Sequence, residues 1–178
     1  MDKPIIRSWQ AADCEALARH LNNRHIWDNC RDALPHPYTR RDAERFIRSA
    51  ATGAQPMHYC IDVDGEAVGG ITFTPGSDVE RFSAEAGYWL AEPLWGRGIM
   101  TQALQAAVAD CFRRSGIVRL QAVVYAGNRA SMRVLEKAGF RRCGIRRKAC
   151  FKNGRFVDCL CYELLREEFT PDNTPTIG

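Results

Sequence analysis

The spacing of apolar residues along the chain switches between the period of a strand and the period of a helix. Helical spacing predicts helices over 12–21, 23–29, 101–115 and 128–138, and one that follows Thr39 and buries Ala43, Phe46, Ile47 and Ala50. Apolar runs predict strands over 5–9, 57–63, 66–74, 82–90, 120–125, 140–151 and 155–165. The pairs Asp64-Gly65 and Asn153-Gly154 separate successive strands and predict tight hairpins.

The order of these elements predicts the fold class. Most successive strands are joined by short turns and are expected to pair antiparallel, but strands 82–90 and 120–125 are joined through a helix, which predicts a parallel crossover. We therefore expect a mixed α+β domain over residues 1–169. It has one sheet of about six or seven mostly antiparallel strands, about four flanking helices, and a loose tail over 170–178.

Composition adds limits on function. The 178 residues are 46% hydrophobic, which suits one domain with its own core. The net charge is only +4 and no lysine/arginine block is long enough for a nucleic-acid arm, so we expect no nucleic-acid partner. No apolar stretch is long enough to cross a membrane, and the N-terminus does not resemble a signal peptide. The eight cysteines form no C-x-x-C, so we expect no metal site and a cytoplasmic protein with reduced thiols.

The most informative local motif is the turn Trp95–Thr101, W-G-R-G-I-M-T, between a predicted strand and a predicted helix. Its two glycines leave backbone N–H groups uncovered, and the start of the helix adds a partial positive charge and further free donors. Such a turn can hold phosphate groups, and Arg97 can add a charge-assisted contact. Thr101 replaces the third glycine of a dinucleotide fingerprint, and most short Gly-x-Gly turns only redirect the chain. The favoured ligand is the pyrophosphate of a cofactor.

Further motifs downstream make the signal specific. Taken together, W-G-R-G-I-M-T-Q-A (95–103), N-R-A-S (128–131) and V-L-E-K-A-G-F (134–140) resemble the GNAT superfamily of acyl-CoA-dependent N-acyltransferases. Two other stretches, P-Y-T-R-R-D-A-E-R-F-I (37–47) and E-A-G-Y-W-L (85–90), resemble its RimJ/RimL-like branch, which acetylates the N-termini of ribosomal proteins. The resemblance covers roughly residues 4–166. It implies that the parallel pair of strands is splayed.

The resemblance also implies acetyl-CoA as cofactor. Its pyrophosphate would rest on the turn, and its pantetheine arm would run between the two splayed strands, with the amide of Leu90 facing the thioester oxygen. The side chain of Asn128 would bond the pantetheine amide, act as a plain helix cap, or do both. The implied binding residues are Trp89, Leu90, Trp95, Gly96, Arg97, Gly98, Ile99, Met100, Thr101, Asn128 and Ser131.

Two catalytic residues follow from the chemistry of acetyl transfer. The acceptor amine must lose a proton, and Glu85 is the candidate base, because alternation places Glu85, Gly87 and Trp89 on one face of their strand. The alternative is an exposed strand glutamate paired with a basic neighbour. Many superfamily members use a tyrosine as acid where this chain has Leu135, so Ser131, one helical turn after Asn128, is the candidate donor to the leaving sulfur. Ser131 can also be an ordinary first-turn serine.

The predicted activity is transfer of acetyl from acetyl-CoA to a primary amine by direct attack in a ternary complex. The preferred acceptor is a protein N-terminal α-amine of the ribosomal-protein type, and the protein is expected to be a monomer or a homodimer. Alternative acceptors are a polyamine, an amino sugar, an aminoglycoside or an amino acid, and a non-catalytic CoA-binding module is a further alternative. The basic residues that crowd the last hairpin are usually a solvated face, but they can also steer an acidic acceptor or contact CoA phosphates.

Overall fold

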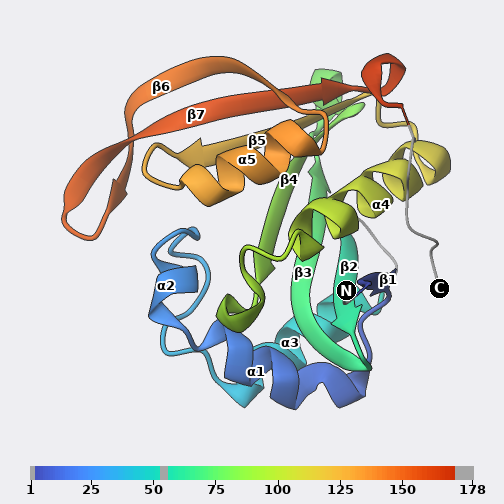
Figure 1. Ribbon diagram of the computed structural model, residues 1–178, viewed down its shortest axis with the longest axis vertical. Coiled ribbons are helices and arrows are strands. Elements are labelled where there is room, and N and C mark those ends of the chain that lie inside the picture. The colour runs from blue at the N-terminus through green and yellow to red at the C-terminus, as the bar shows by residue number, and fades with distance from the viewer. Residues whose placement is uncertain (1–2, 53–55, 171–178) are drawn as a thin grey trace.

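The structure is a computed structural model that describes residues 3–52 and 56–170. One sheet of seven strands has the order β1-β2-β3-β4-β5-β7-β6 (Figure 1). Its strands are β1 (Ile5–Arg7), β2 (Met57–Val63), β3 (Glu66–Pro75), β4 (Ser83–Leu90), β5 (Arg119–Tyr125), β6 (Arg141–Lys152) and β7 (Arg155–Leu165). The helices are α1 (Cys14–Leu21), α2 (Arg24–Trp27), α3 (Arg40–Ala50), α4 (Ile99–Arg114) and α5 (Arg129–Lys137), with short 3-10 turns at Ala11–Asp13, Asp78–Glu80, Glu92–Leu94 and Arg166–Glu168.

The predicted fold class is confirmed, including its single parallel pair. Strands β4 and β5 run parallel, whereas every other neighbouring pair in the sheet is antiparallel. The parallel pairing covers only three positions, and its last pair joins Glu85 to Gln121. Both strands then continue, to Leu90 and Tyr125, without pairing to each other. The sheet therefore divides at its centre.

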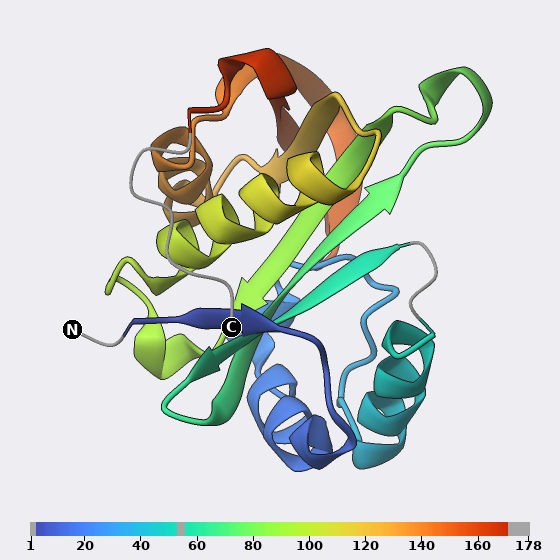
Figure 2. The same cartoon turned by 90° about the vertical axis from the view of Figure 1, so that its right-hand side faces the viewer.

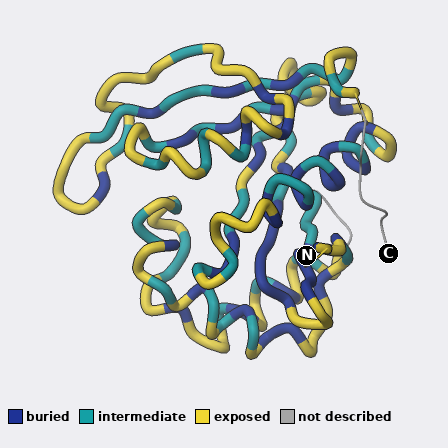
Figure 3. The backbone as a smooth tube through the Cα atoms, in the orientation of Figure 1, coloured by how far each residue is buried: buried dark blue, intermediate teal, exposed yellow. Residues whose placement is uncertain are grey.

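Helices cover the two faces of the sheet unequally. Helix α4 lies across one face, and α1 and α3 lie on the opposite face of the N-terminal strands (Figure 2). The larger core cluster forms around α4, whose Leu104, Val108 and Cys111 are fully buried. A second cluster, which contains Leu17 and Ile47, lies beneath α1 and α3. Buried positions are therefore concentrated along β2, β3, β4 and α4, whereas β6 is mostly exposed (Figure 3).

Local signals in the sequence account for most element boundaries. Thr39 accepts a hydrogen bond from the Asp42 N–H, and the Asp42 carboxylate accepts one from the Thr39 N–H, so the two residues form a capping box before α3. Both residues of Asn153-Gly154 have positive φ, 50° and 76°, as a tight hairpin turn of the primed type requires. No helix among the described residues is long and apolar enough to span a bilayer.

One helix start needs correction. Helix α4 begins at Ile99 rather than at Thr101, because Gly98 is its N-cap and the side chains of Ile99 and Met100 are already buried against the core. Strand β5 alternates between buried and half-buried residues. Residues 171–178 of the predicted tail lie outside the described residues.

Candidate active site

The glycine turn presents main-chain groups at the start of α4. Gly96 and Gly98 have φ values of +76° and +78°, a left-handed conformation that side chains disfavour. A Cβ added at Gly96 would meet nothing within 4 Å, so the surface above this residue is open. No side chain caps the start of α4, while Ile99, 1% exposed, anchors the turn in the core. Ile99 thus fixes the turn to the core, and main-chain groups at the positive end of the sixteen-residue helix α4 lie on the outer side of the turn.

The diverging ends of β4 and β5 turn their main-chain groups toward each other. Leu90 lies opposite Gly69, and the next N–H, that of Ala91, donates to Val68 O at 2.8 Å. Leu90 and Gly69 therefore form a non-hydrogen-bonded pair of the antiparallel sheet. The N–H and C=O of Leu90 point away from β3, toward the β5 side. On β5 the same logic applies to Tyr125, because the Ala126 N–H donates to Asp158 O at 2.9 Å. The two strands thus direct polar main-chain groups into the region where they separate.

The carbonyl groups at these strand ends are already occupied. The Trp95 indole N–H donates to Leu90 O at 2.8 Å, which ties the glycine turn to the end of β4. The Asn128 N–H donates to Tyr125 O at 2.8 Å, which ties the start of α5 to the end of β5. At these two strand ends the Leu90 and Tyr125 N–H groups are directed into the separation.

Asn128, Ser131 and Tyr88 come together at the start of α5. The Asn128 side-chain oxygen accepts from the Ser131 N–H at 3.1 Å, which confirms the predicted helix cap. The Tyr88 hydroxyl, from β4, lies 2.7 Å from Ser131 Oγ and donates to Ser131 O at 3.1 Å. Leu135, where a tyrosine was expected for many relatives, is fully buried. The two hydroxyls therefore form a hydrogen-bonded pair on this side of β4.

Burial sets the protonation of the tyrosine. Desolvation raises the pKa of Tyr88 well above its ordinary value of 10, and the hydrogen bond with Ser131 opposes this only in part. The phenol consequently stays protonated at neutral and moderately basic pH. It remains a hydrogen-bond donor throughout the range in which an enzyme would be assayed.

Glu85 lies on the other face of β4 from Tyr88, as strand alternation predicts. It is the last residue of β4 that pairs with β5, so it stands where the two strands begin to separate. Its carboxylate forms an ion pair with Arg31, which follows α2, and both side chains are partly open to solvent. The paired arrangement that was the alternative for Glu85 is therefore present. It does not exclude a second role, because an exposed ion pair is weak and readily exchanged.

The segment after α2 crosses from Glu85 to the β6–β7 hairpin. Cys30 O accepts from the Tyr125 hydroxyl at 3.2 Å, on the same side of β5 as this segment. Asp32 accepts from Lys152 Nζ at 2.6 Å, and Lys152 also lies 3.2 Å from the centroid of the Trp27 ring. The N-terminal segment and the C-terminal hairpin therefore meet over the face of the sheet that carries Glu85.

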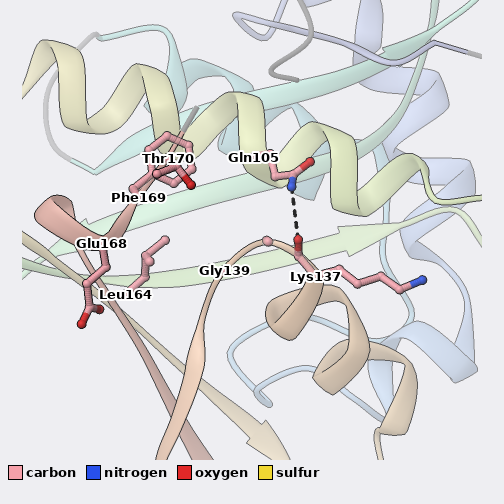
Figure 4. A pocket seen from close by; sticks show the side chains of 8 residues that line it. Gln105, Lys137, Gly139, Leu164, Glu168, Phe169 and Thr170 are labelled. Atoms are coloured by element: carbon pink, nitrogen blue, oxygen red, sulfur yellow. Dashed lines mark hydrogen bonds between the residues drawn. The ribbon is translucent and has the colours of Figure 1, made fainter. Parts of the chain in front are cut away.

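A pocket of about 190 Å³ lies elsewhere, between α4, the C-terminal end of α5 and the end of β7 (Figure 4). Gln105 Nε2 donates to Lys137 O at 3.1 Å across one side of it, and Leu164, Glu168 and Phe169 line the other. Asn128 and Ser131 lie at the opposite end of α5. Because none of the predicted site residues lines this pocket, it is separate from the candidate site.

Sequence reasoning missed three contacts that organise the site. The sequence pointed to Ser131 as a donor but not to its hydroxyl pair with Tyr88. Arg31 was not singled out at all, and neither was the role of Trp95 as a donor to Leu90 O. The parallel crossover offered one usable signal, since it places the end of β4 beside the helix that follows β5. No local pattern indicates the Arg31 contact, which joins residues 54 apart in sequence.

Comparisons with known proteins bear on this arrangement. The family described as acetyltransferase (GNAT) domain matches residues 4–141. The ribosomal-protein-serine acetyltransferase of Escherichia coli (strain K12) is 31% identical over 124 residues, which covers 70% of this chain and 68% of that protein. The structure of Mycobacterium smegmatis RimJ in complex with CoA-disulfide superposes with a TM-score of 0.82 at 25% identity, covering 92% of this chain and 82% of that one. A RimL ribosomal L7/L12 α-N-protein acetyltransferase solved with coenzyme A has the same fold, with a TM-score of 0.81 at 24% identity over 92% of this chain and 94% of that one.

Proposed function

The chain belongs to the GNAT acetyltransferase family, and we propose that within this family it acetylates the α-amine at the N-terminus of a protein, with ribosomal proteins as the favoured class. That it is an acetyl-CoA-dependent N-acetyltransferase follows from the family. The observation that carries the choice of acceptor is the 31% identity to an enzyme named for ribosomal-protein serine.

The glycine turn suits the diphosphate of acetyl-CoA. Open space above Gly96, two left-handed glycines and an uncapped helix start give main-chain donors room to approach phosphate oxygens. We assign the diphosphate to residues Trp95–Thr101, with the N–H groups of Arg97, Gly98, Met100 and Thr101 as donors. A side chain at either glycine would narrow this approach, so the residues present fit the ligand.

The region between β4 and β5 suits the pantetheine arm. An arm that carries amide groups needs main-chain partners, and the N–H groups of Leu90 and Tyr125 point into this region. We assign Trp89 and Leu90 to one wall and Asn128 to the other. The oxygen of the Asn128 side chain caps α5, and its amide nitrogen makes no hydrogen bond to any described residue. Capping and ligand binding are therefore compatible in one side chain.

The proton acceptor and the donor to the leaving group lie on opposite faces of β4. Acetyl-CoA supplies the acetyl group as a thioester whose thiol is the leaving group. Glu85 accepts the proton of the ammonium, directly or through water, because a protein N-terminus with a pKa of about 8 is largely protonated at neutral pH. The Leu90 N–H donates to the carbonyl oxygen as negative charge develops there. Ser131 donates a hydrogen bond toward the leaving sulfur, and the Tyr88 hydroxyl, which keeps its own proton, orients the Ser131 hydroxyl.

The proposal is tested with a panel of amines. Purified protein is incubated with acetyl-CoA and peptides that begin with free serine or alanine, and with a polyamine, an amino sugar, an aminoglycoside and free amino acids; thiol release and product mass are recorded. The same peptides with a blocked N-terminus and an internal lysine are the matched controls. Acetylation confined to free N-termini is expected. Turnover of a small amine with none on any peptide would overturn the choice of acceptor.

A further inference from the structure

The β6–β7 hairpin carries a concentrated positive charge. Residues 142–156 contain six lysines and arginines and no acidic residue, whereas the whole chain has a net charge of +4. The rest of the chain is therefore net negative, and the protein is electrically asymmetric. β6 is the edge strand of the sheet, and most of its residues are exposed.

Most of these basic side chains form no ion pair with a carboxylate of the described residues. Lys152 is buried and paired with Asp32, but the other five cations form no ion pair with any carboxylate of the described residues. They are Arg142, Arg146, Arg147, Lys148 and Arg155. Elsewhere on the surface the arginines are commonly paired, as Arg113 and Arg114 are with Asp110. Five unpaired cations on one hairpin repel one another, so they add to the external field of the protein and not to its stability.

Two phenylalanines lie exposed among these cations. Phe151 and Phe156 are 60% and 67% exposed and lie directly opposite each other in the register of β6 and β7. Their ring centroids are 5.1 Å apart at an interplanar angle of 64°. An exposed aromatic pair within a charged surface is typical of a contact site. The hairpin surface is defined here as these two rings together with the five unpaired cations.

The hairpin surface is held beside the candidate entrance for the amine. Lys152, only 5% exposed, lies over the Trp27 ring and contacts Asp32, and Asn153 donates to Asp28 at 2.9 Å. These contacts fix the tip of the hairpin to the segment after α2, the same segment whose Arg31 pairs with Glu85. A polypeptide whose N-terminal amine reaches Glu85 would leave the site past this hairpin.

We propose that the hairpin surface docks the acidic body of the polypeptide whose N-terminus is acetylated; this rests on the proposed function. Charge complementarity selects the partner, since five cations attract carboxylates and repel a polyamine. The phenylalanines add an apolar contact that a small amine cannot use. The 64° angle between the rings offers no parallel platform for stacked bases, so a polypeptide fits better than a nucleic acid.

The test compares two peptides that share their first residues. One carries aspartate and glutamate downstream, and the other carries asparagine and glutamine at those positions. The hairpin variant is Arg146→Gln, Arg147→Gln and Lys148→Gln, and the control variant is Arg41→Gln, Arg48→Gln and Arg81→Gln, which removes equal charge from distant surfaces. At low salt the parent and the control variant should show a KM about tenfold lower for the acidic peptide, and the hairpin variant should lose most of that difference. The kcat and the KM for acetyl-CoA should not change.

Each remaining outcome has a defined meaning. Equal KM values for the two peptides in the parent, or an acidic preference that survives in the hairpin variant, would overturn docking while leaving N-terminal acetylation intact. Absence of acetylation on both peptides would instead defeat the proposed function. Sedimentation showing a dimer that the hairpin variant breaks would assign the surface to a second copy. RNA that competes with the acidic peptide through the hairpin cations would assign it to nucleic acid. Either assignment would overturn docking of an acidic polypeptide.

Discussion

The hydroxyl of Tyr88 offers a test that separates structure from chemistry, through the variant Tyr88→Phe. This hydroxyl lies 2.7 Å from Ser131 Oγ and donates to Ser131 O at 3.1 Å. A neutral hydrogen bond contributes about 0.5–1.5 kcal/mol net, so losing the two should lower the free energy of unfolding by about 1–2 kcal/mol. If the pair also donates to the leaving sulfur, kcat should fall at least about tenfold, which corresponds to about 1.4 kcal/mol in the barrier.

The assay for this prediction is thiol release at saturating acetyl-CoA, with urea unfolding measured in parallel. Ser131→Ala should lower kcat with little change in the KM for acetyl-CoA, and the double variant should lose less than the sum of the two single losses, because the two hydroxyls act as one unit. Since burial raises the pKa of Tyr88, its proton is retained and the parent's kcat should not decline between about pH 7 and 10 on its account. A variant Tyr88→Phe that loses stability but keeps kcat within about twofold of the parent would refute the catalytic role.

Further predictions concern the turn, the base and the N-terminal ion pair. Gly98→Ala, at φ +78°, should lower the free energy of unfolding by about 1 kcal/mol and weaken CoA binding in calorimetry. Gly144→Ala is the control and should leave CoA binding unchanged. Equal CoA affinities of the Gly98→Ala variant and the parent would count against the turn as the diphosphate site. Glu85→Gln should lower kcat and flatten its rise toward basic pH at constant CoA affinity, and a parent-like pH profile would exclude Glu85 as base. Burial raises the pKa of Asp13, but its hydrogen bond from Arg7 and the Gln10 N–H outweigh this and lower it overall. The stabilisation by the Asp13 carboxylate is therefore present above about pH 4 and is lost as the pH falls below that. Asp13→Asn should lower the free energy of unfolding by about 3 kcal/mol at pH 7 and should flatten its decline toward acid pH. A variant whose free energy of unfolding declines toward acid pH as steeply as that of the parent would contradict this.

Local chemistry made much of the fold predictable. The capping box at Thr39, the cap at Asn128 and the turns at Asp64-Gly65 and Asn153-Gly154 depend on residues within four positions of one another. The parallel pair followed from the order of elements alone, because a helix separates two apolar strands. The start of α4 was placed two residues late, since burial of Ile99 by distant strands decides where that helix begins.

The site was predictable only in part, because its arrangement depends on long-range contacts. The glycine turn is a continuous motif and was found directly. The contacts of Glu85 with Arg31 and of Lys152 with Asp32 join residues far apart in sequence, and nothing near either residue specifies its partner. The alternation of β4 correctly separated Tyr88 from Glu85, but it carried no information on which helix Tyr88 would reach.

A crystal structure with CoA bound is the most direct test of how this chain handles its acyl donor. We expect the diphosphate on the main-chain N–H groups of residues 97–101, the pantetheine arm between β4 and β5, and the sulfur next to the hydroxyls of Tyr88 and Ser131. Density for CoA that leaves the glycine turn empty, or that places the sulfur on the Glu85 face of β4, would contradict it.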